Sequence, residues 1–210
     1  NELYYSGSEN LGSELYKYND ITNTVSLVKD LYPGANGSAP GYFTIFNNEL
    51  FFAAYTLGYG GKRHICKTDG TLAGTTEVLD ASNYSFTPCG LKVVNDKLIY
   101  VAVNPLNNND VDLFKCEYSV SESKYQIELV KHFTKGQGTS PLYLTTEFTL
   151  LNNELYFVCS QDTDTNQGYV RQIYKTDGTT SGSVKAVSIG SDHIGSIYSA
   201  FPTDLFRFNG

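Results

Sequence analysis

The sequence predicts an all-β protein made of repeated antiparallel sheets, and three observations support this fold class. The chain is rich in residues that favour strands and turns, with 17 Tyr, 12 Phe and 19 Gly among its 210 residues. No window shows the sustained periodicity of an amphipathic helix. A motif and the strands around it recur along the chain, which is the signature of a repeat architecture.

The clearest repeat is the stretch Lys67–Thr76 (KTDGTLAGTT), which returns as Lys175–Val184 (KTDGTTSGSV). Asp-Gly between short apolar and β-branched runs is a strong hairpin signal. A tight turn that matches the strand twist needs positive φ at its central residues, which Gly adopts freely and Asp tolerates. Each copy is therefore expected to join two antiparallel strands.

A second pattern divides the chain into four units of roughly 50 residues, each expected to hold four strands. The first strands are Asn1–Tyr5, Asn48–Phe52, Asp96–Tyr100 and Asn153–Phe157. The second strands, which alternate polar and apolar residues, are Glu14–Tyr18, His64–Thr68, Asp112–Cys116 and Gln172–Thr176. The third strands are Val25–Asp30, Thr76–Asp80, Ile127–Lys131 and Val184–Val187. The fourth strands, after links rich in Gly, Ser and Pro, are Phe43–Phe46, Leu91–Val94, Phe148–Leu151 and Leu205–Phe208.

Four such units predict a β-propeller of four-stranded antiparallel blades, because each blade buries its faces only against its neighbours. A linear β-solenoid fits less well, since its repeats are shorter. We expect one domain, residues 1–210, with blades starting near 1, 48, 96 and 153. The last strand, 205–208, is expected to pair with residues 2–7 and close a four-bladed ring. The alternative is that the four blades are part of a larger propeller array.

The repeats resemble those of the ELWxxDGT repeat family. The resemblance rests on residues in all four units, and the segments that show it best are Glu14–Lys17, Val28–Gly34, Ser38–Pro40, Asn48–Phe52 and Lys67–Thr75. It is close in the second and fourth units and weak in the third, where Cys116–Ser119 replaces the Thr-Asp-Gly-Thr turn. The resemblance implies propeller-like repeats of large secreted or surface-associated proteins. It implies no activity, because the shared residues build turns and cores.

The composition limits the classes of partner and the location. A formal net charge of -7 gives no basic face for nucleic acid, and no apolar run approaches the roughly 18 residues of a membrane span. Without an N-terminal Met, the chain is expected to be a processed product or an excerpt. Four Cys without a CxxC pair argue against zinc and leave one or two disulfides open. Glycosylation sequons at Asn36 and Asn83 weakly favour a secreted or cell-surface glycoprotein.

The longer loops of the expected blades all fall on one face of the disc, where variable loops on a rigid scaffold commonly form binding surfaces. The loop before the second unit's second strand carries tyrosines and basic residues that suit an acidic or sugar ligand. A later link on the same face adds an aspartate followed by a histidine. These candidate ligand-binding residues are Tyr55, Tyr59, Lys62, Arg63, Asp192 and His193. The alternative is a solvated loop without a ligand.

The same face holds a candidate metal site at Asp162, Asp164 and Asn166. Oxygen-bearing side chains at every second position, followed by Gly168, can surround a hard cation such as Ca²⁺. The stretch departs from the twelve-residue calcium loop, because Gly comes one position late and no bidentate Glu follows. A solvated polar loop is the favoured alternative, and calcium is the one cofactor that the sequence suggests.

No arrangement of catalytic residues stands out. His132 and His193 are placed in links on the loop face, and no Gly-x-Ser-x-Gly motif accompanies them. Cys66 is expected in the core, because it takes the place of an aromatic residue. The sequence therefore favours a non-enzymatic module for adhesion or for recognition of a glycan or protein ligand. The alternatives are a structural subunit of an extracellular assembly and, least favoured, a hydrolase.

Overall fold

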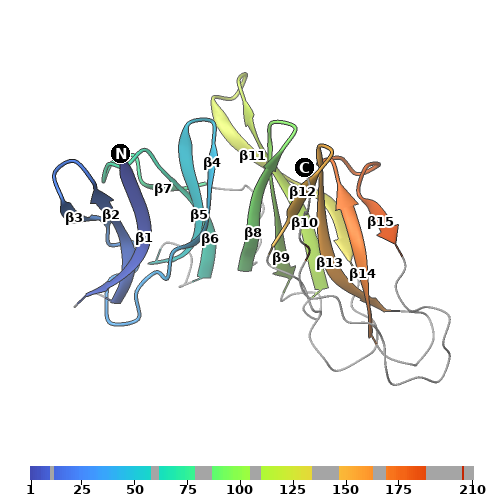
Figure 1. Cartoon of the computed structure of the whole chain (residues 1–210), viewed down its shortest axis with the longest axis horizontal. Helices are drawn as coiled ribbons and strands as arrows, with labels where there is room; N and C mark the ends of the chain where they lie inside the picture. Colours follow the sequence, from blue (N-terminus) through green and yellow to red (C-terminus); the bar gives the residue numbers. More distant parts are fainter. Residues whose placement is uncertain are drawn as a thin grey trace. The chain divides into compact units, whose positions relative to one another are not determined.

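The computed structural model describes residues 1–9, 12–57, 62–78, 87–104, 110–133, 147–162, 169–187 and 205. The chain forms two compact units, residues 1–88 and 89–210. Every sheet in them is antiparallel (Figure 1). None of the described residues forms a helix long and apolar enough to cross a membrane.

The first unit contains two sheets. The three-stranded sheet has the order β1 (Glu2–Glu9), β2 (Gly12–Asn19) and β3 (Thr24–Lys29). The four-stranded sheet has the order β4 (Gly41–Phe46), β5 (Glu49–Thr56), β6 (Lys62–Thr68) and β7 (Thr76–Glu77). Consecutive strands are hydrogen-bonded neighbours in both sheets, so the unit contains no crossover between its described strands.

The second unit contains two four-stranded sheets. The first comprises β8 (Thr87–Val94), β9 (Lys97–Asn104), β10 (Asp110–Ser119) and β11 (Lys124–Phe133). The second comprises β12 (Thr149–Leu151), β13 (Glu154–Asp162), β14 (Tyr169–Thr176) and β15 (Val184–Val187). These sheets confirm the all-β class and the four-stranded antiparallel arrangement. The described strands do not form a closed sheet.

Closure of the chain through residues 205–208 depends mainly on residues outside the described part. Of these four residues only Leu205 is described, and its carbonyl oxygen accepts a hydrogen bond of 2.6 Å from Thr149 Oγ1 of β12. The first sheet has three described strands, where the other sheets begin with the strand that ends the preceding repeat.

Three short hairpin turns have positive φ at both central residues: Asn47-Asn48, Asn95-Asp96 and Asn152-Asn153. Two consecutive positive φ values match the right-handed twist of the flanking strands, and Asn and Asp tolerate this conformation. The Asp-Gly connections were predicted to be tight turns with positive φ at both central residues, and they differ from that prediction. They join β6 to β7 and β14 to β15 over longer turns, in which Gly70 and Gly178 have positive φ and the preceding Asp does not.

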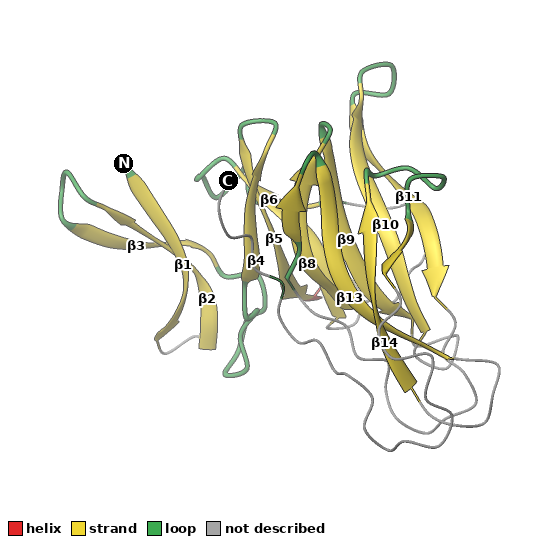
Figure 2. Ribbon diagram, turned by 45° about the vertical axis from the view of Figure 1, so that its right-hand side comes forward, coloured by secondary structure: helices red, strands yellow, loops and turns green. Residues whose placement is uncertain are grey.

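Within each unit, the two sheets pack face to face around an apolar core (Figure 2). In the first unit, Leu15 and Val28 of one sheet cluster with Phe52 and Cys66 of the other. In the second unit, the Phe133 ring of β11 lies 4.9 Å from the Tyr174 ring of β14, centroid to centroid. Side chains alternate between the faces of a strand, so each sheet offers one set of residues to this core.

The expected core position of Cys66 is confirmed. Buried side chains occupy the equivalent position in all four repeats: Tyr16, Cys66, Phe114 and Tyr174. All four cysteines of the chain carry free thiols, so the disulfides that the sequence left open are not formed in this structure. Burial raises the pKa of the Cys159 thiol to about 12, which disfavours the reactive thiolate.

Candidate functional site

The predicted ligand residues are only partly described. Tyr55 and Arg63 lie directly opposite each other on β5 and β6, and Tyr55 is partly exposed. Lys62 belongs to β6, but only its main chain is described. Tyr59, Asp192 and His193 lie outside the described residues.

Arg63 stabilises the segment that leads into β4. Its Nη2 donates hydrogen bonds of 3.2 Å to the carbonyl oxygens of Ala39 and Ala53. Its guanidinium carbon lies 4.9 Å from the centroid of the Tyr42 ring, a cation–π arrangement. The side chain therefore binds its own chain and holds the approach to β4 in place.

The predicted calcium ligands cannot be assembled from the described atoms. Asp162 ends β13 and only its main chain is described, while Asp164 and Asn166 lie outside the described residues. Among the side chains that are described, no group of three or more His, Cys, Asp or Glu is arranged to hold a metal ion.

The two Asp-Gly-Thr turns share one internal hydrogen-bond network. Asp69 Oδ1 accepts bonds from the main-chain N and the hydroxyl of Thr71, at 2.9 and 2.7 Å. Asp177 and Thr179 repeat this at 2.8 and 2.7 Å. These bonds, the hydroxyl first, lower the pKa of both carboxyl groups. The repeated sequence therefore specifies a preformed turn rather than a flexible loop.

The turn of the second sheet docks on the first sheet. Lys17 Nζ donates to Gly70 O at 3.1 Å, and Lys29 Nζ donates to Thr75 O at 2.6 Å. A Cβ on Gly70 would lie 2.3 Å from Tyr4 Oη, so any other residue there would have to displace the Tyr4 side chain. Burial raises the pKa of Tyr4 to about 12, helped by its hydrogen bond to Glu2.

The turn of the fourth sheet docks on the third in the same way. Lys131 Nζ donates to Ser183 O at 2.9 Å, in the place of the bond from Lys29 to Thr75. A Cβ on Gly178 would lie 2.7 Å from Lys97 Cδ. The repeated motif thus connects neighbouring sheets in both units.

A buried carboxylate organises the long link after β3. Glu14 is fully buried, and its oxygens accept bonds from the main-chain N of Leu31 at 2.9 Å, and from the N and Oγ of Ser38 at 2.8 and 2.6 Å. Because these donors have no access to water, the carboxylate satisfies groups that would otherwise be costly to bury. Glu14 therefore fixes the link.

The third repeat carries a carboxylate–imidazole–carboxylate cluster around the equivalent residue, Asp112. Asp112 and His132 are directly opposite each other on β10 and β11, and Asp112 Oδ1 is hydrogen-bonded to His132 Nδ1. Asp110 Oδ2 lies 3.3 Å from the other ring nitrogen, Nε2. The two Asp side chains are buried, whereas the His132 side chain is 35% exposed.

The cluster of Asp110, Asp112 and His132 is suited to acid–base chemistry, in which the imidazole accepts and donates a proton. A buried carboxylate that holds Nδ1 fixes the orientation and tautomer of an imidazole, and leaves Nε2 to exchange a proton with an adjacent group. The exposed fraction of the ring allows an outside molecule to approach. We therefore take this cluster as the candidate functional site.

Sequence reasoning missed this site. It placed His132 in a link, whereas the residue lies in β11, because this strand extends to Phe133. It treated Asp112 only as the polar residue that opens a second strand. The signal was present as Asp-Val-Asp at the start of a strand whose antiparallel partner ends in His-Phe. The pairing register that brings the residues together came only from the structure.

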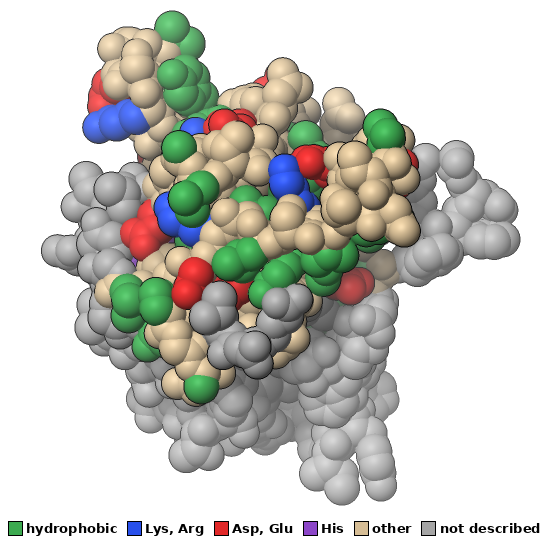
Figure 3. Space-filling view, turned by 90° about the vertical axis from the view of Figure 1, so that its left-hand side faces the viewer, with side chains coloured by type: hydrophobic (Ala, Val, Ile, Leu, Met, Phe, Trp, Pro, Cys, Tyr) green, Lys and Arg blue, Asp and Glu red, His purple; other side chains and the backbone are tan. Residues whose placement is uncertain are grey.

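The outer face of the first sheet carries exposed apolar side chains. The pairing register places Leu3, Tyr18 and Val25 on one face of β1, β2 and β3, and Leu3 and Val25 are 64% and 53% exposed. Figure 3 shows hydrophobic side chains on the side of the molecule that holds this sheet. The patch contains no group suited to catalysis.

Comparison with known proteins adds information about the fold. No protein-family model and no curated protein sequence matches the chain. The resemblance to the ELWxxDGT repeat family therefore stays a prediction. Similar folds occur among solved structures. One, from a study of two prolyl endopeptidases, has a TM-score of 0.54 and 13% sequence identity, and the match covers 89% of this chain. It covers 24% of that chain, so the present chain spans about a quarter of it.

Two further solved structures match with lower TM-scores. An endo-arabinase from Bacteroides thetaiotaomicron has a TM-score of 0.48 and 14% identity, with 91% of this chain and 77% of that chain covered. A thermostable family-43 glycoside hydrolase has a TM-score of 0.49 and 12% identity, with 92% and 69% covered.

These matches correct the function expected from the sequence. The prediction of a non-enzymatic adhesion or recognition module relied on the repeats being scaffold signatures. The match with a TM-score of 0.54 comes from a study of prolyl endopeptidases, so the assignment of a non-enzymatic role from the scaffold alone was wrong. At this level of identity the comparison shows the fold alone, and an activity has to be argued from the residues of the site.

Proposed function

We propose that the four sheets are blades of a β-propeller and that the chain is a module of a hydrolytic enzyme, with His132 as its acid–base group. One observation carries this proposal. His132 is partly exposed and is held between two buried carboxylates, Asp112 at Nδ1 and Asp110 at Nε2. The face-to-face sheet packing within each unit supports the propeller.

The cluster suits the activation of water. Asp110 Oδ2 faces Nε2 of His132 at 3.3 Å, so the contact has to open for water to reach this nitrogen. With Nδ1 donating to Asp112, Nε2 then takes a proton from the water while the water oxygen attacks the scissile carbon. The bond to the leaving group then breaks, and the imidazolium returns the proton to the leaving atom. Asp110, next to Nε2, stabilises the imidazolium between these steps.

The kinds of bond that the chain is proposed to cleave follow from this chemistry rather than from the comparisons. Water activated by a histidine can cleave an acyl or a glycosyl bond, and the chain has no Gly-x-Ser-x-Gly nucleophile motif. The prolyl endopeptidase match supports the scaffold only, because this chain covers a quarter of that protein.

A hydrolysis screen tests the proposal. The full chain is incubated with chromogenic glycosides, esters and proline-containing peptides, and then compared with His132→Gln and Asp112→Asn. We expect turnover of one class, with kcat reduced at least about 100-fold by either substitution. Glu128→Gln is the control, since Glu128 lies on the same strand as His132, is exposed and forms its ion pair with Lys115, outside the cluster. Turnover that is unaffected by His132→Gln, or absent from every class, contradicts the proposal.

We also propose an extracellular location. The support is the resemblance to the ELWxxDGT repeats and the two sequons, of which Asn36 lies on the surface and Asn83 lies outside the described residues. Expression through a eukaryotic secretory pathway, followed by endoglycosidase treatment, tests this. A mobility shift that Asn36→Gln removes supports secretion-compatible folding, and a mass equal to that of the bare chain contradicts glycosylation at this site.

A further inference from the structure

The fourth sheet carries a second copy of the residues that hold the Asp-Gly-Thr turn in the first unit. In the first sheet, Lys17 Nζ lies 2.8 Å from Glu2 Oε1, and Tyr4 Oη donates to Glu2 Oε2 at 2.7 Å. We call Glu2, Tyr4 and Lys17 the first receptor. In the fourth sheet, Lys175 Nζ lies 2.8 Å from Glu154 Oε1, and Tyr156 Oη lies 3.4 Å from Glu154 Oε2. We call Glu154, Tyr156 and Lys175 the second receptor.

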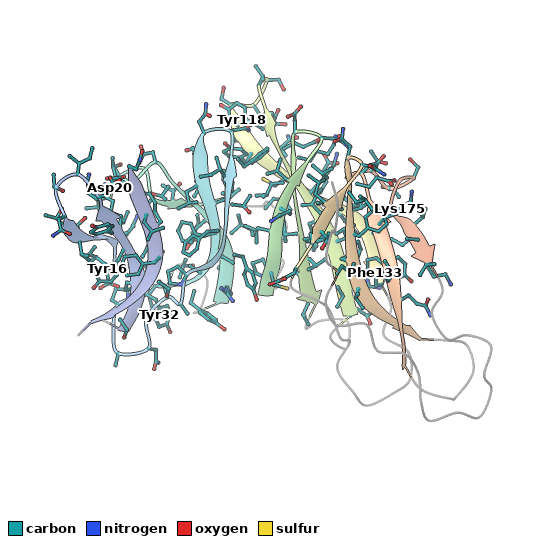
Figure 4. The ribbon with its side chains drawn as sticks, in the orientation of Figure 1. Tyr16, Asp20, Tyr32, Tyr118, Phe133 and Lys175 are labelled. Atoms are coloured by element: carbon teal, nitrogen blue, oxygen red, sulfur yellow. The ribbon has the colours of Figure 1, made fainter. Side chains whose placement is uncertain are left out.

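The pairing register makes the two sets equivalent. Tyr4 is directly opposite Lys17, and Tyr156 is directly opposite Lys175. The next residues along the strands, Phe157 and Tyr174, belong to the core shared with the third sheet. Because side chains alternate, the second receptor lies on the other face of its sheet, away from that core. Figure 4 labels Lys175 on β14 of this sheet.

The first receptor holds a turn, and the second holds none within the described part of the chain. Lys17 donates to Gly70 O as well as pairing with Glu2, whereas Lys175 bonds to Glu154. The ion pair is therefore already formed in the fourth sheet, as it is in the first. A preformed receptor loses less side-chain entropy when its ligand binds.

We infer that the second receptor binds the Asp-Gly-Thr turn of a further repeat, one that is not among the four of this chain. We expect glycine at that position of the turn, because a Cβ on Gly70 would lie 2.3 Å from the Tyr4 hydroxyl and Tyr156 takes the place of Tyr4. The chain's own turns at Gly70 and Gly178 are already docked within their units. Its other two hairpins carry Asp20 and Tyr118 at the equivalent positions, which are labelled in Figure 4.

The occupant is thus defined by its chemistry. It is a turn with an Asx-type hydrogen-bond network, glycine at positive φ, and a glycine carbonyl that accepts a bond from Lys175. This is the interface seen between the first two sheets, continued by one more blade. The proposed occupant is therefore one further blade, packed on the fourth sheet as the second sheet packs on the first.

A cyclic peptide tests this inference. The probe carries the sequence of residues 67–76 between two added cysteines joined as a disulfide, and it is titrated into the ¹⁵N-labelled full chain. We expect saturable shifts centred on β13 and β14 with a Kd of about 1 mM, which is typical of a small contact. Lys175→Met should weaken binding at least about tenfold, and Lys175→Arg, which keeps a donor, should retain it.

Two controls make the result decisive. Lys185→Met changes an exposed lysine of β15 in the same sheet and should leave the Kd unchanged. A peptide with alanine in place of the glycine equivalent to Gly70 should not bind. The inference would be overturned by shifts outside β13 and β14 or by equal binding of the alanine peptide. It would also be overturned if the Kd of Lys175→Met were within about twofold of that of the unaltered chain, or if binding did not saturate up to about 10 mM.

Discussion

Replacement of Gly70 by alanine tests whether the Asp-Gly-Thr turn holds neighbouring sheets together. Gly70 has a φ of 90°, and its Cβ would lie 2.3 Å from Tyr4 Oη, far inside van der Waals contact. The tyrosine ring can move away only by giving up its 2.7 Å hydrogen bond to Glu2. The substitution therefore affects the contact between the first two sheets as well as the turn itself.

The expected cost has two parts. Alanine at positive φ costs about 1 kcal/mol relative to glycine, and overpacking against Tyr4 costs about 1 to 3 kcal/mol. Gly34→Ala is a matched control, because Gly34 also has positive φ, 121°, and a Cβ at that position would have no neighbouring atom within 4 Å. Gly34→Ala should show only the first part. The difference between the two variants isolates the contact with Tyr4.

Tyr4→Phe provides the rescue. It removes the hydroxyl that the new methyl group meets, and the next ring atom, Cζ, lies at an ordinary 3.5 Å. In urea denaturation followed by far-UV circular dichroism, Gly70→Ala should lower the free energy of unfolding by about 2 to 4 kcal/mol. Tyr4→Phe should cost less in the Gly70→Ala background than alone, a coupling of about 1 kcal/mol or more. Equal effects of Gly70→Ala and Gly34→Ala, or additive effects with Tyr4→Phe, would refute the reasoning.

Three further outcomes follow from the structure. Glu14→Ala should lower the free energy of unfolding by about 3 kcal/mol in urea, because buried donors lose their acceptor, whereas an unchanged value would mean that the link does not depend on Glu14. The hydrogen bond from the Thr179 hydroxyl is the main reason why the pKa of Asp177 is lower in the folded state. The stability that Asp177 contributes is therefore present above its unfolded pKa of about 3.9 and is lost as pH falls through the folded pKa. Asp177→Asn should reduce the loss of stability in acid, measured by urea unfolding at several pH values. Thiol labelling of the native protein should modify the half-buried Cys89 before the fully buried Cys159, and mass spectrometry would expose the opposite order.

Much of the fold could be predicted from local patterns. The order of the strands in each repeat could be read from the sequence, because side-chain alternation and turn chemistry act between neighbours in sequence. The position of each Asp-Gly connection was predicted correctly, but its backbone conformation was not. Its geometry depends on hydroxyls such as Thr68 and Thr75, which meet at 2.7 Å across the turn, and a two-residue signal does not contain that contact.

The candidate site was less predictable. Asp110, Asp112 and His132 come together because β10 and β11 pair in one particular register, and that register includes a shift between Leu113 and Phe114. Such a bulge moves every later pair by one residue. The residues that the sequence favoured, such as Tyr55 and Arg63, stood out by composition, which says nothing about their neighbours in space.

The amino-acid sequence by itself determined the all-β class, the four repeats and the glycine required in each Asp-Gly-Thr turn, since these depend on side-chain period and local backbone conformation. Only the tertiary structure decided which sheets face one another, which lysine reaches each turn, and which carboxylates hold His132. These contacts join residues far apart in the chain, and their energies depend on burial and distances that a linear pattern does not specify.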